Sequence, residues 1–321
     1  MKILITGITG FAGSHLTRYL QGIAGVEVAG LDLQGPTERF RGLFDDGGPT
    51  VHGCDMADGE LLDEILRIEN PDAIIHLAAR AQVAGAWQQA GAILETNVVG
   101  TQILMQAAQE AVPKAKVLLI SSSEVYGRVT PQELPLTETA TLRPNNPYSV
   151  SKAAQEFVGL AYHEAFDMDV VIARPFNHIG PMQVGNFVVP SFALQVAEIE
   201  AGVREPVIKV GNLESRRDFT DVRDIVRAYY LLVAHGRTGE VYNIASGESH
   251  AISEILEMLL DIAKIAPEIE NIPGLMRPSD TPVVEGDSSK LKLLQPWAAE
   301  IPLRQSLKDT LEYWREQVRA K

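Results

Sequence analysis

Tyr148 and Lys152 are the residues whose types and spacing point most directly to chemistry. Residues four positions apart lie on one face of a helix, so the phenol and the ammonium would be neighbours. A free phenol has a pKa of about 10 and is a poor acid–base catalyst at neutral pH. A neighbouring cation stabilises phenolate, and we therefore expect Lys152 to lower the pKa of Tyr148. This spacing occurs by chance in many helices, so the interpretation depends on the sequence around it.

Two further reactive side chains follow the strand-like run KVLLI at residues 116–120. Parallel sheets bind ligands at the carboxyl ends of their strands, which is where Ser122 should lie. Its hydroxyl could hydrogen-bond a substrate oxygen. Glu124 adds a carboxylate at the same strand end. From the residues alone, the predicted catalytic group is therefore Ser122, Tyr148 and Lys152.

A glycine-rich turn lies between the first strand-like run and the first predicted helix. The segment KILITGITGFAGSHL spaces its glycines as Gly-x-x-Gly-x-x-Gly, not as the common Gly-x-Gly-x-x-Gly fingerprint. Glycines let a pyrophosphate approach the backbone, and a helix N-terminus offers free N–H groups. Alone, the glycines could form only a tight turn. Their place between strand and helix predicts a dinucleotide site made of Gly7, Thr9, Gly10, Phe11, Ala12 and Gly13.

Asp32 ends the second strand-like run, 19 residues after Gly13. A carboxylate there accepts hydrogen bonds from the ribose 2′-hydroxyl of adenosine and repels a 2′-phosphate. We therefore expect NAD to be favoured. Arg39 and Arg41 follow closely enough to keep NADP as an alternative.

The elements that must position these residues alternate between strands and helices. Strands are expected at 2–6, 26–32, 50–53, 73–77, 116–120 and 169–173, and helices at 14–21, 59–69, 96–110 and 148–166. This alternation predicts an α/β fold with a doubly wound parallel (Rossmann) sheet.

Beyond Arg174 the pattern changes to a proline-punctuated region with fewer strands. Expected elements there are strands at 207–210 and 241–245 and helices at about 192–201, 222–234, 251–264 and 305–319. We predict a NAD(P)-binding domain at 1–175 plus about 215–247. A smaller, interleaved α/β domain at about 176–214 plus 248–321 would bind the substrate.

Composition excludes several classes of function. The 321 residues carry a formal net charge of −14, which argues against nucleic-acid binding, and the single Cys54 excludes an internal disulfide framework. The 7 histidines are dispersed, so no metal site is expected. No apolar run approaches the length of a membrane helix, and no signal peptide is evident. We expect a cytoplasmic enzyme without a membrane partner.

Taken together, these motifs and the HLAA segment at 76–79 resemble the extended short-chain dehydrogenase/reductase family over nearly the whole chain. The resemblance implies that Tyr148 donates or accepts the proton and that Lys152 also holds the nicotinamide ribose. Pro175 would lie against the nicotinamide carboxamide. It further implies an adenine border at Asp55 and Met56, and a cofactor cleft lined by Leu77, Ala78, Ala79, Arg80 and Asn97.

The C-terminal half is similar to the nucleotide-sugar branch of that family. The matching segments are ARPFNHIGP, NFVVP, RRDFTDVRD and MRPSD. In that branch Arg217 and Arg277 would clamp the pyrophosphate, since guanidinium groups bind phosphate bidentately. The other substrate-binding residues implied by the resemblance are Ser123, Glu124, Asn177, Asn186, Phe187, Val188, Lys209, Asn212 and Asp280.

The stretch VGNLESRRDFTDVRD resembles enzymes that act on GDP-sugars. The resemblance implies reduction of the C4 ketone of GDP-4-keto-6-deoxy-D-mannose to GDP-D-rhamnose. The nicotinamide would give the hydride, Tyr148 would protonate the alkoxide, and Ser122 would steady it. Two helices, at about 96–110 and 148–166, resemble those that pair into a four-helix bundle in family homodimers.

Alternatives remain open at this point. A GDP-mannose 4,6-dehydratase would use Glu124 as base, although such enzymes typically carry threonine where this chain has Ser122. A GDP-fucose synthase would need cysteine in place of Glu124. A UDP-sugar 4-epimerase fits Gly211-Asn212-Leu213 less well. A non-catalytic, NAD(P)-sensing relative would commonly lack the tyrosine or the lysine.

Overall fold

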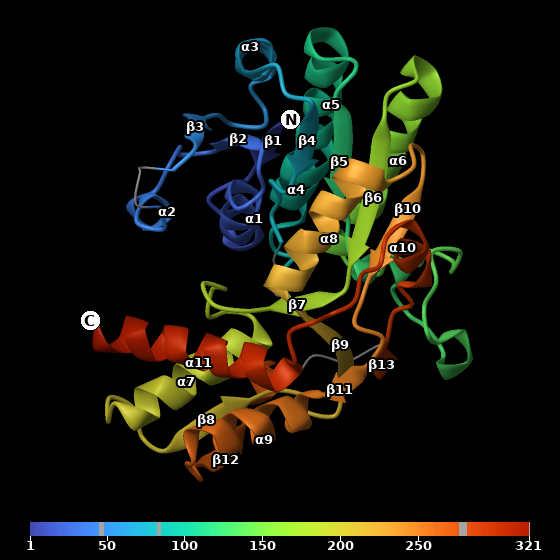
Figure 1. Cartoon of the computed structure of the whole chain (residues 1–321). Helices are drawn as coiled ribbons and strands as arrows, with labels where there is room; N and C mark the ends of the chain where they lie inside the picture. The colour runs from blue at the N-terminus through green and yellow to red at the C-terminus, as the bar shows by residue number, and fades with distance from the viewer. Residues whose placement is uncertain (45–47, 82–84, 276–280, 321) are drawn as a thin grey trace.

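Seven parallel strands form the large sheet of the computed structural model, which describes residues 1–44, 48–81, 85–275 and 281–320 (Figure 1). The strand order is β10-β6-β5-β4-β1-β2-β3. The chain adds β2 and β3 on one side of β1 and the later strands on the other side, so the order reverses between β1 and β4. Such a reversal is where doubly wound sheets bind ligands. The predicted fold class is confirmed. The strands are β1 (Lys2–Thr6), β2 (Glu27–Asp32), β3 (Thr50–Gly53), β4 (Ala73–His76), β5 (Lys116–Ile120), β6 (Val170–Pro175) and β10 (Val241–Ile244).

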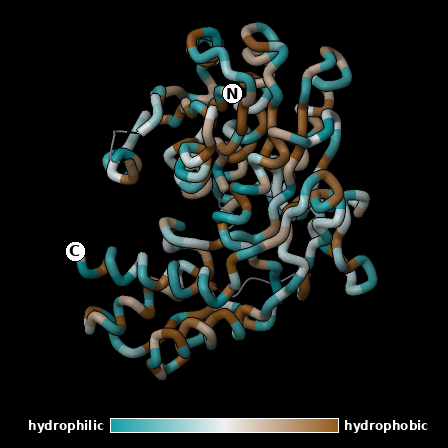
Figure 2. Tube along the Cα trace, in the orientation of Figure 1, coloured by the Kyte–Doolittle hydropathy of each residue, from teal (hydrophilic) through white to brown (hydrophobic). Residues whose placement is uncertain are grey.

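Helices cover both faces of this sheet, which explains why its central strands are almost continuously apolar. On one face lie α1 (Phe11–Gln21) and α8 (Val222–His235). On the other lie α3 (Gly59–Glu69), α5 (Gly100–Ala111) and α6 (Pro147–Phe166). Figure 2 shows hydrophobic stretches running through the middle of the molecule, whereas the C-terminal helix is largely hydrophilic.

A smaller region lies below the carboxyl edge of the large sheet (Figure 1). Its three helices enclose a separate core that includes Phe192, Phe219, Ile255 and Leu311. Its sheets have the orders β11-β9-β13, with β7 also paired to β9, and β12-β8. The elements are β7 (Asn177–Ile179), α7 (Val188–Glu200), β8 (Val207–Val210), β9 (Arg216–Asp221), β11 (Ser249–Ala251), α9 (Ile252–Ala263), β12 (Glu268–Asn271), β13 (Val283–Val284) and α11 (Leu303–Arg319).

Short helical segments complete the described chain. One of them, η1 (Glu95–Val99), is a π-helical turn directly before α5, inside the range expected to be one regular helix. The others are α2 (Glu38–Arg41), α4 (Ala90–Leu94), η2 (Ser123–Tyr126), η3 (Pro131–Glu133), η4 (Pro273–Leu275) and α10 (Ser289–Leu294). No helix in the described ranges is long and apolar enough to cross a membrane.

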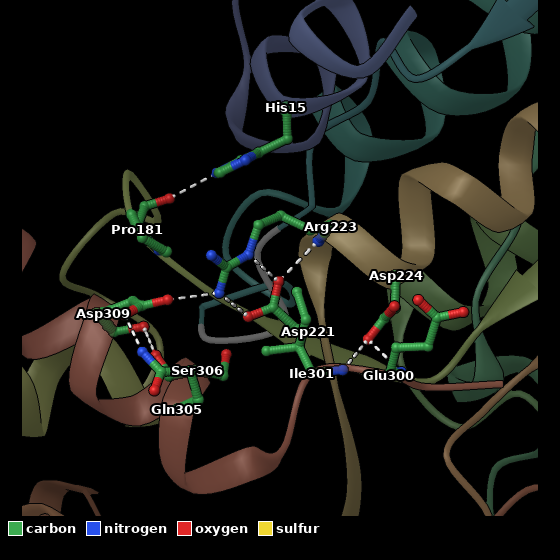
Figure 3. A network of polar contacts seen from close by, with 11 residues as sticks. His15, Pro181, Asp221, Arg223, Asp224, Glu300, Ile301, Gln305, Ser306 and Asp309 are labelled. Carbon is green, nitrogen blue, oxygen red and sulfur yellow. Dashed lines mark hydrogen bonds and ion pairs between the residues drawn. The ribbon is translucent and has the colours of Figure 1, made fainter. Parts of the chain in front are cut away.

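Polar contacts join the large sheet's helices to the smaller region (Figure 3). The Asp221 carboxylate caps α8 and accepts from Arg223 Nε and Nη2, each at 2.8 Å. Arg223 also donates to Asp309 of α11 at 2.7 Å. On α1, His15 Nε2 lies 2.9 Å from the carbonyl oxygen of Pro181. The N-terminal halves of α1 and α8 are thus tied to the smaller region. The division into domains at 1–175 plus 215–247 stays a prediction, since α8 packs on the large sheet while β9 pairs outside it.

Candidate active site

Tyr148 is the second residue of α6, and the start of this helix is well defined by its sequence. Asn146 is the N-cap, and its side-chain oxygen accepts from the Ser149 backbone N–H at 2.9 Å. Pro147 occupies the first helical position, where a missing N–H costs nothing. The Ser149 hydroxyl in turn accepts from the Asn146 N–H at 3.1 Å. This reciprocal cap places Tyr148, 9% exposed, at one position of the first turn.

The phenol of Tyr148 is neutral at physiological pH. Burial raises the pKa of Tyr148 to about 12, a hydrogen bond with Ser122 lowers it, and the charge of Glu124 raises it. The pKa of Tyr148 thus lies above its ordinary value and not below it as expected, because loss of solvation outweighs the favourable contacts. A neutral phenol is the form that can donate a proton.

Lys152 is 3% exposed and lies one turn further along α6. Its Nζ donates to the Ile120 carbonyl at 2.7 Å and to Gln155 Oε1 at 2.8 Å. Burial lowers the pKa of Lys152 to about 7, and the charge of Glu156 raises it. The side chain is therefore poised to exchange a proton near neutral pH.

Ser122 and Glu124 lie where β5 ends, as predicted. Ser122 is the N-cap of η2, and its hydroxyl accepts from the Glu124 backbone N–H at 3.2 Å. The same hydroxyl forms the hydrogen bond with Tyr148. Ser123, the next residue, is buried. The structure therefore brings Ser122, Glu124 and Tyr148 together at one strand end.

The glycine-rich turn has no room for side chains. Gly7 has φ +70°, and a Cβ there would lie 2.8 Å from the Ala78 nitrogen. A Cβ on Gly13 would lie 2.5 Å from the carbonyl oxygens of Gly7 and Ile8. Helix α1 begins at Phe11, three residues earlier than predicted, so its free N–H groups lie directly after Gly10. These features fit the pyrophosphate of a dinucleotide.

Asp32 lies at the end of β2, beside this turn. Its Oδ2 accepts from the Thr9 hydroxyl at 2.8 Å and from the Thr9 backbone N–H at 3.3 Å. The carboxylate is partly exposed, in the place where an adenosine ribose would be bound.

Asn97 connects the predicted cofactor cleft to the catalytic helix. It lies in η1, and its Oδ1 accepts from the Arg80 N–H at 2.8 Å. Its Nδ2 donates to the Ser151 hydroxyl at 2.9 Å, and that hydroxyl donates to the Tyr148 carbonyl at 2.7 Å. Single π-turns inside helices occur frequently at functional sites. Here the π-turn lets the Asn97 side chain hold both the Arg80 backbone of the cofactor cleft and Ser151 of α6.

A buried ion pair supports the same helix. Arg174 of β6 donates from Nη2 to Glu156 Oε2 at 2.7 Å and from Nε to Glu156 Oε1 at 2.8 Å. Ser121 also donates to Glu156, and Arg174 donates to the Tyr126 hydroxyl at 3.0 Å. Sequence reasoning missed Gln155, Glu156 and Arg174. Their signal was the spacing of three and four residues after Lys152, which places two of them on its helix face.

Arg217 of β9 faces the catalytic group from the smaller region. Its Nη1 donates to the carbonyl oxygens of Arg216 at 2.7 Å and Thr281 at 3.1 Å. Burial lowers the pKa of Arg217, while the nearby charge of Glu124 raises it. A guanidinium from one region and a carboxylate from the other therefore face the same space.

The remaining predicted ligand residues fall into four groups. Asn212 closes its own turn, accepting from the Glu214 N–H at 2.9 Å and donating to the Ser215 hydroxyl at 3.2 Å. Lys209 is exposed on β8. Arg277 and Asp280 lie outside the described residues. The others lie at element ends or beside the cofactor turn, and their roles remain predictions: Asp55, Met56, Leu77, Ala79, Pro175, Asn177, Asn186, Phe187 and Val188.

Comparison with known proteins agrees with this geometry. The chain is 36% identical to GDP-6-deoxy-D-mannose reductase of Pseudomonas aeruginosa over 318 residues, covering 99% of this chain and 98% of the relative. It is 30% identical to dTDP-glucose 4,6-dehydratase of Streptomyces niveus, covering 98% and 93% of the two chains.

Solved structures give the same picture. The structure of RMD from Pseudomonas aeruginosa complexed with NADPH matches with a TM-score of 0.88 at 35% identity, covering 98% of this chain and 99% of that chain. UDP-glucose 4-epimerase from Thermotoga maritima matches with a TM-score of 0.88 at 27% identity, covering 99% and 100%.

Fold and site together define an NAD(P)-dependent oxidoreductase of the extended short-chain dehydrogenase/reductase type. Within that class, residues 4–310 match the family described as GDP-mannose 4,6 dehydratase, and the chain belongs to this family.

Proposed function

We propose that the protein reduces the C4 ketone of GDP-4-keto-6-deoxy-D-mannose to GDP-D-rhamnose with NAD(P)H. The observation that carries the chemistry is the placement of Tyr148, Ser122 and Lys152 together at the carboxyl end of β5. The nearly full-length similarity to the Pseudomonas aeruginosa reductase supports the substrate and the direction.

Each catalytic side chain has a distinct role in this reaction. The reduced nicotinamide supplies the hydride when it is bound. Ser122 donates a hydrogen bond to the C4 oxygen, and Tyr148 transfers its proton to that oxygen as negative charge develops. Lys152, as an ammonium, stabilises the tyrosinate that remains. Solvent protons then restore the phenol for the next turnover.

The glycine turn and Asp32 lead us to favour NAD over NADP. A 2′-phosphate beside the Asp32 carboxylate would meet like charge. Arg39 donates to the Met182 carbonyl at 2.7 Å and lies over the Tyr313 ring, so its guanidinium already has partners. The related reductase was solved with NADPH, which keeps NADP in view. We expect Asp32→Ala to raise the ratio of kcat/KM for NADPH to that for NADH roughly tenfold, the effect of about 1.4 kcal/mol.

A direct assay tests the proposed reaction. Purified protein is incubated with GDP-4-keto-6-deoxymannose and either NADH or NADPH, and products are identified by mass and NMR. One cofactor oxidised for each GDP-rhamnose formed is the expected result. Lack of oxidation with both cofactors, in protein shown to bind them, would refute the proposal.

Glu124 supports GDP-mannose 4,6-dehydratase activity as the second candidate. Its backbone N–H donates to the Ser122 hydroxyl, and the charge of its carboxylate acts on Tyr148 and Arg217. A dehydratase needs such a base to remove the C5 proton. Formation of the keto-sugar from GDP-mannose alone, lost in Glu124→Gln, would establish this reaction instead.

We further propose that Arg217 binds the diphosphate.

We also propose that the enzyme is a homodimer through α5 and α6. The surface of these helices and of η1 exposes several large hydrophobic side chains: Val99, Val150, Phe157 and Phe166. Two α5–α6 pairs packed together would form a four-helix bundle and cover them. Light scattering of the wild type and of Phe157→Lys tests this, with a dimer expected only for the wild type.

A further inference from the structure

Gln155 contacts the catalytic lysine from within the same helix. Its Oε1 lies 2.8 Å from Lys152 Nζ, and the Ile120 carbonyl lies 2.7 Å from the same nitrogen. Gln155 is 1% exposed and Lys152 is 3% exposed, so water does not substitute for these acceptors. An ammonium has three donors, and in a buried site each hydrogen bond to it is charge-assisted and strong.

The other charged and titratable groups around Lys152 are already paired or are neutral, so Gln155 is the side chain left to accept a hydrogen bond from its ammonium. Glu156, also on α6, is engaged by Arg174 of β6 and by Ser121, so its carboxylate is already paired. From β4, His76 acts on Lys152 across the helix–sheet contact, but burial lowers the pKa of His76 to about 3, so it is neutral. Tyr148 is a neutral phenol.

The other half of the Gln155 amide is unusual. Its Nε2 is buried and has no hydrogen-bond partner among the described residues. Leaving a buried donor unpaired destabilises a protein, so stability alone does not account for a glutamine here. A neutral lysine amine has a lone pair, and a half-turn of the amide would present Nε2–H to it. One side chain could thus serve both protonation states of Lys152.

We propose that Gln155 is a positioning residue for Lys152, whose amide oxygen holds the ammonium at the carboxyl end of β5 and stabilises its charge. Removing that oxygen shifts the lysine towards its neutral form. Replacing the amide with a carboxylate has the opposite effect, because an adjacent negative charge favours the ammonium. Two substitutions at one position should therefore move the same titration in opposite directions.

The titration of Lys152 can be followed without substrate. In protein labelled with 13C-lysine, the Cε signal is recorded by NMR over a pH series, and its absence in Lys152→Met assigns it. A midpoint near the value of about 7 is expected in the wild type. Gln155→Leu should lower the midpoint and Gln155→Glu should raise it, each by about one pH unit.

Controls separate positioning from folding. Gln305→Leu on α11 also removes a glutamine hydrogen bond, the one to Asp309 at 2.6 Å (Figure 3), and should leave the midpoint unchanged. If Gln155→Leu does not fold, Gln155→Glu alone still tests the direction. Midpoints equal to wild type in the folded variants, or shifts of the same sign in both, would overturn the inference.

Turnover provides a second readout, which rests on the proposed function. The pH at which kcat/KM for the keto-sugar begins to fall on the alkaline side should be lower in Gln155→Leu and higher in Gln155→Glu. Opposite shifts in the NMR titration without any turnover would retain the role of Gln155 and refute only the proposed reaction. If kcat/KM fell in both variants while the pH of its alkaline decline stayed the same, Gln155 would have a purely structural role.

Discussion

The glycine-rich turn and the start of α6 both serve the active site, but opposite features hold them in place. In the turn, backbone atoms pack so closely that a Cβ at Gly13 would lie 2.5 Å from two carbonyl oxygens. On α6, buried polar side chains bind one another, Gln155 with Lys152 and Glu156 with Arg174. The turn therefore depends on the absence of side chains, and the helix on particular side chains being present.

The most severe loss of activity should come from the helix. In Tyr148→Phe the ring keeps its packing but has no proton to give, so we expect kcat to fall about a thousandfold. Cofactor affinity, measured by fluorescence titration, should change little. Tyr162→Phe is the matched control, since it lies on the same helix and its hydroxyl accepts from Gln102, away from Ser122 and Lys152. Equal activity of the two variants would contradict the role of Tyr148.

Breaking the buried pair beneath the helix should affect stability more than chemistry. Arg174→Leu leaves Glu156 buried without its partner, and we expect the free energy of unfolding to fall by about 3–5 kcal/mol. The control Arg67→Leu breaks the exposed pair with Asp63, where solvent screening leaves little net stabilisation to lose. Urea denaturation measures both. A cost for Arg174→Leu no larger than that of the control would show that the pair does not support α6.

In the turn, adding a single methyl group should be harmful. Gly13→Ala forces the backbone apart, and we expect about 1–3 kcal/mol of destabilisation and weaker cofactor binding. Gly91→Ala on α4 is the control, because a Cβ there has no atom within 4 Å. Thermal unfolding and cofactor titration compare the two. If both variants behave alike, close packing is not what limits the turn.

The pH dependence of activity should reflect the helix rather than the turn. Lys152 has its pKa lowered to about 7, so it is an ammonium below that pH and neutral above it. Because catalysis needs the ammonium, kcat/KM should be level below about pH 7 and fall about tenfold per unit above it. The free energy of unfolding should change in the opposite direction. Between about pH 7 and the pKa of an unfolded lysine, about 10.4, the folded protein holds a neutral Lys152 while the unfolded chain holds a charged one. Stability therefore rises with pH in this range. A kcat/KM that rises through this range would contradict the assignment.

The sequence predicted the turn better than the helix's surroundings. Strand, glycines and helix follow one another within fifteen residues, so a local pattern contains the whole feature. Strands at Lys116–Ile120 and Val207–Val210 were also predicted with their observed bounds. The pKa of Tyr148 was predicted in the wrong direction, because burial is set by residues distant in the chain.

Other features were missed because their signal is not local. Strand β9 has the charged sequence RRDFTD, which does not look like a buried strand. Its Asp218 can be buried because its carboxylate accepts hydrogen bonds from Ser246, Gly247 and Gly286. The π-turn η1 interrupts a helix whose sequence looks regular. In both, tertiary hydrogen bonds override local preference, and these become visible only once distant segments are brought together.

The most direct test of the proposed reaction follows the hydride itself. The protein is given GDP-4-keto-6-deoxymannose with NADH or NADPH carrying deuterium at both C4 positions of the nicotinamide, a parallel sample receives GDP-mannose without reduced cofactor, and the products are examined by NMR. The proposal predicts GDP-rhamnose with deuterium at C4 of the sugar and one cofactor oxidised per product. An unlabelled product, or keto-sugar formed from GDP-mannose with its own C4 hydrogen moved to C6, would contradict it.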